Sequence, residues 1–242
     1  MKEVSLLDLL KSGAHFGHST SRWNPKMKQY IYGTRGDIHI IDLEKTRTAL
    51  IKALDFLTHL TKNGGTVMIV GTKKQSRELV KKTAQDIKVP FVSLRWLGGT
   101  FTNFKTIIRT VKKLEKYELL MASEANFNQY TKKERLGIKR EADKLQRLFE
   151  GLKDLRKLPD CIFVADTKHD KIAVQEAKLS GVKVVGLVDT NSDPSLIDYP
   201  IPCNDDSSKT LALVLELVAE AIEQGKRAVP APTAPAAGVL KK

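Results

Sequence analysis

The chain has 242 residues, 41% of them hydrophobic, which is enough to bury the core of one large α/β domain or of a domain with an insertion. Its 41 lysines and arginines against 28 aspartates and glutamates give a net charge of +13, which indicates a polyanionic partner. The only cysteines, Cys161 and Cys203, lie far apart, which excludes a disulfide framework or a zinc knuckle and predicts buried, reduced thiols.

The N-terminal residues, from Met1 to Asp8, include an acid within a short apolar run and lack the apolar region of a signal peptide. No apolar run of about 18 residues occurs anywhere in the chain, so no membrane-spanning helix is predicted. We therefore expect a cytoplasmic protein without a membrane partner.

A short amphipathic helix is predicted around Leu6 to Leu10, and Gly13 ends it. The next segment, residues 14–28, shows no regular pattern but mixes histidine, cationic and aromatic side chains. A basic loop with aromatic faces is typical of RNA binding. Its candidate RNA contacts are Arg22, Trp23, Lys26 and Lys28.

Two short apolar runs, Tyr30–Gly33 and Ile38–Ile41, flank a polar turn and predict a small β-hairpin. Asp42 then suits a helix N-cap. Apolar residues at helical spacing follow it as far as Asn63, where two glycines stop the predicted helix.

After this helix, apolar strands alternate regularly with helices, which predicts a parallel sheet covered on both faces. The predicted strands are Thr66–Val70, Phe91–Leu94, Cys161–Ala165, Val184–Val188 and a short strand around Ile201, and the predicted helices are Gln75–Ile87, Lys171–Leu179 and Lys209–Gln224.

An insertion interrupts the sheet between Phe104 and Glu150. Apolar residues step by three and four in two series, which predicts an antiparallel helical, coiled-coil hairpin. The series are Phe104, Ile107, Val111, Leu114 and Met121, and Ile138, Ala142, Leu145, Phe149 and Leu152. With 12 cations and 7 acids, its outer face is either a solvated surface or an arm that reaches RNA or a neighbouring protein.

The predicted organisation is therefore an α/β domain of residues 1–103 and 151–225, with the hairpin of residues 104–150 inserted into it. The domain includes the N-terminal helix, the basic loop and the small β-hairpin. Residues 226–242 are rich in alanine and proline and are predicted to be disordered.

The stretch Arg95–Phe104 places a Gly-Gly turn between a strand and the first hairpin helix. Two interpretations stay open for it. Either Trp96 packs in the core of a tight connection, or Arg95 binds phosphate and the tryptophan stacks on bases. Asn103 and Lys105, where the charged helix begins, are further candidate RNA contacts.

Nucleotide-binding fingerprints are absent where this fold class would place them. The turn after Val70 has a single glycine, where a dinucleotide site needs three, and it is not a phosphate-binding P-loop. Its Lys73 and Lys74 precede a predicted helix and suit one phosphate, including that of an RNA backbone. No nucleophile constellation is recognisable either, so no enzyme activity and no small-molecule substrate are expected.

Acid-rich turns follow the later strands. One interpretation is purely structural: the acidic side chains cap helices and turns. The other interpretation is a binding site for a structural divalent ion, zinc or magnesium. Its ligands would be Asp189, Asp205 and Asp206, with His18 from the N-terminal loop. No cofactor is required in either case.

Several stretches together resemble one family, that of bacterial small-subunit ribosomal protein S2. The resemblance covers roughly residues 1–225, and Cys203 stands where many members carry glycine. The stretches are His15–His18, Trp23–Met27, Ile38–Lys45, Gly71–Lys73, Arg95–Thr100, Thr102–Asn103, Asp189–Pro194, Ile201–Pro202 and Asn204–Asp206.

This resemblance implies a flavodoxin-like, Rossmann-like three-layer α/β/α domain with a protruding helical hairpin. It also implies a structural constituent of the small ribosomal subunit that contacts rRNA and neighbouring ribosomal proteins and supports docking of the messenger-binding protein S1, and thereby translation. Two alternatives remain at this point: a nucleotide-dependent α/β enzyme and a free RNA-binding regulator.

Overall fold

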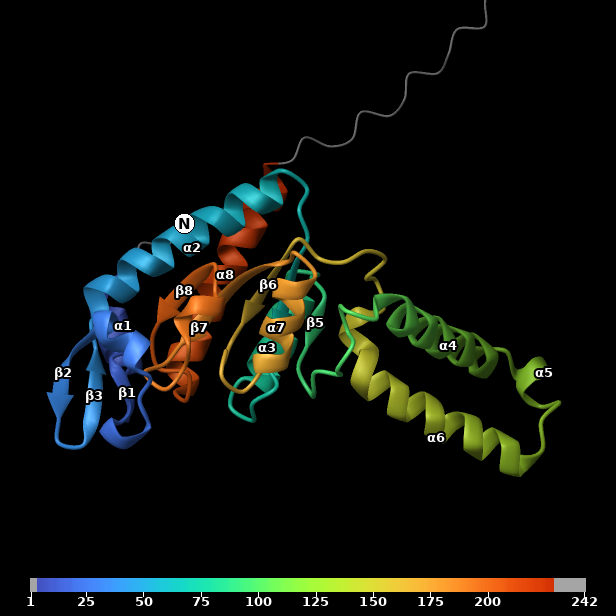
Figure 1. Cartoon of the computed structure of the whole chain (residues 1–242). Helices are drawn as coiled ribbons and strands as arrows, with labels where there is room; N and C mark the ends of the chain where they lie inside the picture. The colour runs from blue at the N-terminus through green and yellow to red at the C-terminus, as the bar shows by residue number, and fades with distance from the viewer. Residues whose placement is uncertain (1–3, 229–242) are drawn as a thin grey trace, which may run out of the picture.

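The computed structural model describes residues 4–228, without the side chains of residues 124 and 125. A five-stranded parallel sheet forms its centre, in the order β5-β4-β6-β7-β8 (Figure 1). With these strands numbered along the chain the order is 2-1-3-4-5, the flavodoxin-like order, so the expected fold class is confirmed. The strands are β4 (Val67–Val70), β5 (Phe91–Val92), β6 (Cys161–Val164), β7 (Lys183–Val188) and β8 (Tyr199–Pro202).

Helices cover both faces of the sheet because every strand alternates its apolar side chains between them. In β4, Val67 and Ile69 pack on one face, whereas Met68 and Val70 pack on the other. The first face carries α1 (Leu6–Ser12), α2 (Leu43–Lys62), α3 (Arg77–Asp86) and α8 (Ser208–Arg227). The second carries α7 (Lys171–Leu179) and the base of the helical hairpin.

Both cysteines lie in the first apolar cluster as free, buried thiols, as predicted. Burial raises the pKa of each thiol, so both remain protonated near neutral pH. No helix within residues 4–228 is long and apolar enough to cross a membrane.

A second, antiparallel sheet forms near the N-terminus, in the order β1-β3-β2. The prediction of no regular structure in residues 14–28 was wrong, because β1 pairs with β3 and two 3-10 turns follow it. A tertiary contact holds β1: a Cβ on Gly17 would lie 2.5 Å from Thr190 Cγ2, so only glycine fits there. The elements are β1 (Phe16–Ser19), η1 (Thr20–Arg22), η2 (Pro25–Tyr30), β2 (Ile31–Arg35) and β3 (Ile38–Ile41).

The predicted helix boundaries hold best where a capping residue is present. The Asp42 side chain accepts hydrogen bonds from the backbone N–H groups of Glu44 and Lys45, and α2 ends at Lys62 before Asn63. Helix α8 instead runs to Arg227, so residues 226 and 227 are helical and not part of a disordered tail. Residues 229–242 of the predicted tail lie outside the described part of the chain.

The helical hairpin projects away from the sheet in Figure 1. Thr131 and Glu134 form a reciprocal capping box at the start of its returning helix. At the base, Ile107, Val111 and Phe149 belong to the same apolar cluster as the strands of the second sheet face. Its elements are α4 (Phe104–Ala122), α5 (Glu124–Phe127), α6 (Lys132–Phe149) and η3 (Glu150–Leu152).

Candidate functional site

A lysine surrounded by carboxylates lies at the carboxyl edge of the sheet, between β4 and β6, where the strand order reverses. The Lys73 ammonium is 2.8 Å from Asp166 Oδ2, 2.9 Å from Asp205 Oδ1 and 2.7 Å from Asp206 Oδ1. Burial alone would lower the pKa of Lys73, but hydrogen bonds to the acids raise it overall. Flavodoxin-like folds bind ligands in this crevice, whereas here an internal ion pair network lies in it.

His18 joins this network from the N-terminal sheet. Its Nδ1 lies 3.1 Å from Asp189 Oδ2, and its Nε2 lies 3.4 Å from Asp206 Oδ2. The His18 backbone N–H donates to Thr190 Oγ1 at 2.8 Å, which fixes β1 against the loop after β7. The structure therefore brings the four predicted metal ligands together in what we call the charged cluster: His18, Lys73, Asp166, Asp189, Asp205 and Asp206.

The charged cluster holds more acids than cations, since four carboxylates face one ammonium and one imidazole. Burial, with the nearby charges of Asp166 and Asp189, raises the pKa of Asp205 to about 7. The hydrogen bond to Asp189 raises the pKa of His18 more than burial lowers it. Near neutral pH the cluster therefore favours proton uptake.

The side chains of the charged cluster are of the types that bind metal ions, but their arrangement is not that of a metal site. Within residues 4–228, no three His, Cys, Asp or Glu side chains converge as metal ligands. A divalent ion near Asp205 and Asp206 would compete with the Lys73 ammonium. Two hydrogen bonds support the interpretation that these acids cap turns. Asp189 accepts one from the backbone N–H of Thr190, and Asp166 accepts one from the backbone N–H of Lys168. The divalent ion stays a prediction.

A buried glutamate explains the Gly-Gly turn. The Glu176 carboxylate on α7 accepts hydrogen bonds from the backbone N–H groups of Gly99 at 2.6 Å, Phe101 at 2.9 Å and Thr102 at 3.3 Å. Gly99 has φ +89°, a left-handed conformation that favours glycine and turns these N–H groups toward the acid. The turn is thus a structural clamp.

Trp96 belongs to this clamp and not to an exposed stacking surface. It is 7% exposed, packs edge-to-face on Phe101 with ring centroids 4.9 Å apart, and its Nε1 lies 3.5 Å from Glu176 Oε1. The core interpretation of Trp96 is therefore the one the structure supports. Glu176 is not among the predicted site residues, although an acid on the apolar stripe of α7 with Ala173 and Ala177 is a visible signal.

Most of the predicted RNA contacts lie at the same carboxyl edge, because Lys74 follows β4, Arg95 follows β5, and the N-terminal loop packs against the turn after β7. Asn103 and Lys105 lie instead at the start of α4. Trp23 is half-buried with its ring 5.1 Å from that of His39. Lys73 is less suited to RNA than the others because carboxylates already balance its charge. The exposed members are Arg22, Lys26, Lys28, Lys74, Arg95, Asn103 and Lys105.

A comparison with protein families accounts for this combination of fold and basic surface. The family model described as ribosomal protein S2 matches residues 9–225. The chain belongs to the ribosomal protein S2 family. Members of this family are structural constituents of the small ribosomal subunit and not enzymes, so rRNA and other ribosomal proteins are the partners of this S2-family chain, in the cytoplasmic ribosome.

Individual members of the S2 family are similar over most of the chain. The small ribosomal subunit protein uS2 of Dichelobacter nodosus is 47% identical over 228 residues, which cover 94% of this chain and 85% of that protein. The proteins of the same name from Rhizobium etli and Sinorhizobium medicae are each 45% identical over 225 residues, covering 93% of this chain and 88% of theirs.

Proposed function

We propose that this S2-family chain binds small-subunit rRNA through the carboxyl edge of its sheet and the loop between β1 and β2. The observation that supports this proposal is the gathering of exposed cations there, among them Arg22, Lys28, Lys74 and Arg95. Lys26 contributes less free charge, because its ammonium lies 2.7 Å from Asp193 Oδ2.

The proposed binding follows the RNA backbone and not the base sequence. Phosphate contacts from Lys and Arg position a protein on RNA but carry no sequence information. No signature of a base-reading RNA module occurs in the sequence. Affinity is therefore distributed over several cations, each with a modest share.

Filter binding of small-subunit RNA fragments across a salt series tests this proposal. Lys28→Ala, Lys74→Ala and Arg95→Ala should each weaken binding similarly for unrelated RNAs and reduce the magnitude of the salt slope by about one unit or less. Lys62→Ala, at the far end of α2, is the matched control and should leave the slope unchanged. A flat salt dependence of the unaltered protein, or loss of binding to one sequence only, contradicts the proposal.

We further propose that protein S1 docks on an apolar patch beside α1. Leu7 is 64% exposed, Leu10 48% and Tyr32 81%, and they border a hollow of about 410 Å³ between α1, β2, β3 and the start of α2. Exposed apolar patches around a hollow mark protein interfaces. S1 should cosediment less with small subunits that carry Leu7→Glu, while Leu179→Glu, at an even more exposed leucine on α7, should have no effect.

We also propose a structural divalent ion at His18, Asp189, Asp205 and Asp206. It would bind beside the Lys73 ammonium and would not replace it. Elemental analysis of the dialysed protein and melting with and without a chelator test it, since an ion that binds only the folded state raises the melting temperature. Asp205→Asn should then abolish the effect of the chelator. If no metal is bound at stoichiometric level, pairing and capping are the whole role of these acids.

A further inference from the structure

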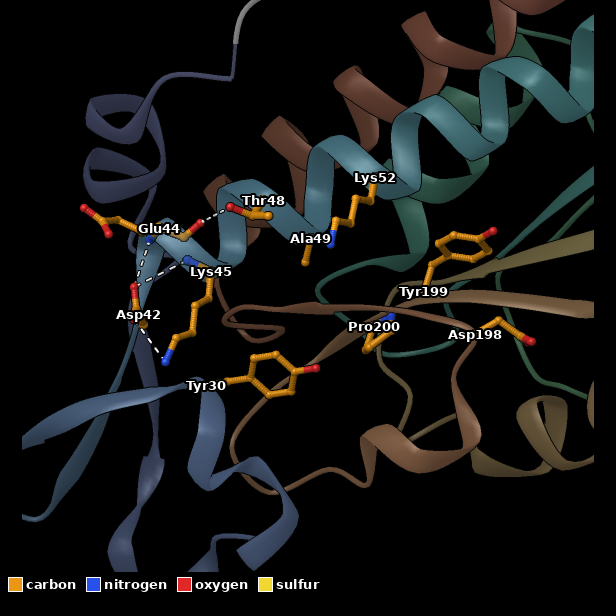
Figure 2. A pocket seen from close by; sticks show the side chains of 10 residues that line it. All are labelled: Tyr30, Asp42, Glu44, Lys45, Thr48, Ala49, Lys52, Asp198, Tyr199 and Pro200. Carbon is orange, nitrogen blue, oxygen red and sulfur yellow. Dashed lines mark hydrogen bonds and ion pairs between the residues drawn. The ribbon is translucent and has the colours of Figure 1, made fainter.

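A hollow that the RNA surface described above does not include opens between the N-terminal half of α2 and β8. Its volume is about 580 Å³, within the range of roughly 300–1,000 Å³ that is typical of small-ligand pockets. Figure 2 shows it bordered by Tyr30, Tyr199 and Pro200 on one side and by Lys45 and Lys52 of α2 on the other. Since β8 is the outermost strand, the hollow lies at the edge of the sheet.

Flat apolar surfaces line one side of this hollow. The Tyr199 ring is held by stacking on Phe56, with ring centroids 4.2 Å apart and an interplanar angle of 18°. Pro200 adds a rigid apolar face beside it, and Tyr30 is half-buried. Among the described residues neither phenol hydroxyl has a hydrogen-bond partner, so each is available to a ligand. Such a surface suits a planar, partly polar group.

The charged side chains that line the hollow are three acids and two lysines, and ion pairs occupy two of the acids and one of the lysines. The Asp42 carboxylate caps α2 and lies 3.4 Å from the Lys45 ammonium, and the rim acid Asp198 lies 3.3 Å from Lys178 and 3.1 Å from Lys183. Glu44 points away from Tyr30 and Pro200 in Figure 2.

Lys52 differs from these paired groups. It is exposed on the side of α2 that borders the hollow, and no carboxylate of residues 4–228 pairs with it. Its ammonium therefore remains available to a ligand phosphate at the edge of the apolar surface.

We propose that this hollow receives one unpaired nucleotide of small-subunit rRNA, with its base against Tyr30, Tyr199 and Pro200 and its phosphate on Lys52. The inference rests on the proposed RNA binding and adds a specific subsite to it. Aromatic side chains stack on unpaired bases of any sequence, and a neighbouring lysine tracks the backbone. The glycine-rich fingerprints that hold free nucleotides are absent from the sequence, which favours a nucleotide of an RNA chain over a free one.

Ultraviolet cross-linking of intact small subunits, followed by trypsin and nuclease digestion, tests the proposal. A nucleotide adduct is expected on Tyr30, in the tryptic peptide of residues 29–35, or on Tyr199, in that of residues 184–209, and fragmentation of the peptide identifies the modified residue. Irradiation of the isolated protein with uridine monophosphate is the free-nucleotide control and should give no such adduct.

Each other outcome of this experiment is decisive. Adducts confined to other residues of this chain, Tyr32 included, overturn the pocket but leave the proposed function intact, whereas no adduct anywhere in the chain contradicts both. An equal adduct yield with free uridine monophosphate would make the hollow a mononucleotide site. In a separate experiment with an amine-reactive cross-linker, a cross-link from Lys52 to another ribosomal protein would make it a protein interface. Either result overturns the proposal.

A matched pair of variants gives an independent test. Lys52→Ala should reduce the magnitude of the salt slope for small-subunit RNA by about one unit or less, whereas Lys62→Ala on the same helix should not. Both lysines are exposed, so melting temperatures should stay within a few degrees of each other. Equal slopes for the two variants contradict the proposed subsite.

Discussion

The charged cluster and the helical hairpin are both rich in ion pairs, but they use them differently. In the cluster, Asp205 is 1% exposed, and Lys73 is held among three carboxylates. In the hairpin, the Lys113 ammonium lies 2.5 Å from Glu141 Oε1, yet both side chains are almost half exposed. Solvent screens the hairpin pair, so it contributes little to stability, whereas breaking a buried network is strongly destabilising. The position of a charge, not its presence, decides whether it holds the fold or is free for RNA.

The same contrast divides the hairpin itself. Its base, with Ile107, Val111, Leu114 and Phe149, is part of the second apolar cluster of the sheet. Its distal part exposes apolar side chains, since Leu119 is 73% exposed and Leu136 is 50% exposed. Only the distal part of the hairpin therefore projects from the domain without packing on the sheet.

Two deletions of different length in the hairpin should give the largest difference in thermal unfolding. Replacing residues 116–139 with a glycine linker leaves the base packed, so thermal unfolding should remain cooperative. Replacing all of residues 104–150 strips one face of the sheet and should abolish cooperative unfolding, as seen by calorimetry. A cooperative transition in the larger deletion would show that the base is dispensable.

The two tryptophans extend the comparison to apolar side chains. Trp96→Ala should lower the free energy of unfolding by about 3 to 5 kcal/mol, because the ring is buried against Phe101. Trp23→Ala should cost clearly less, since that side chain is only partly buried. Urea denaturation of both variants measures the difference, and equal losses would contradict the assignment of Trp96 to the core.

The charged cluster should make stability depend on pH. A His18 pKa raised above 6.5 contributes stability that is present below 6.5 and is lost as pH rises through the folded-state value. An Asp205 pKa raised from 3.8 to about 7 acts in the same direction, because folding favours its protonated form. Stability should therefore fall between pH 6 and pH 8 by an amount on the order of 1 kcal/mol, the value of one pKa unit.

Urea denaturation at the two pH values measures this change. Asp205→Asn should reduce it, whereas Asp193→Asn should not, because the hydrogen bond from Lys26 lowers the pKa of Asp193 to about 2, far below this range. An unchanged pH dependence in Asp205→Asn would remove the cluster as its source.

Local patterns in the sequence account for most of the fold. Asp42 and Asn63 bound α2 as predicted, because a cap and a helical repeat act over a few residues. Continuous apolar runs located the central strands, and the parallel topology then placed Asp189 and Asp205 at one edge of the sheet.

Tertiary contacts account for what the sequence did not show. Strand β1 depends on the fit of Gly17 against Thr190, and the turn after Arg95 depends on Glu176, which lies 77 residues beyond Gly99. No repeat or spacing within either segment reports such a contact. Lys73 and Lys74 are chemically identical neighbours, so only the fold shows which of them is held among carboxylates.

The central claim is that buried charges stabilise the fold, whereas exposed charges bind RNA. Lys73 and Lys74 test this claim most directly. Lys73→Met should lower the free energy of unfolding by about 3 kcal/mol or more, because it leaves buried carboxylates unpaired, and should leave the salt slope of RNA binding unchanged. Lys74→Met should change stability by less than about 0.5 kcal/mol and reduce the salt slope by about one unit or less. Equal effects of the two substitutions, or the reverse assignment, would contradict the account.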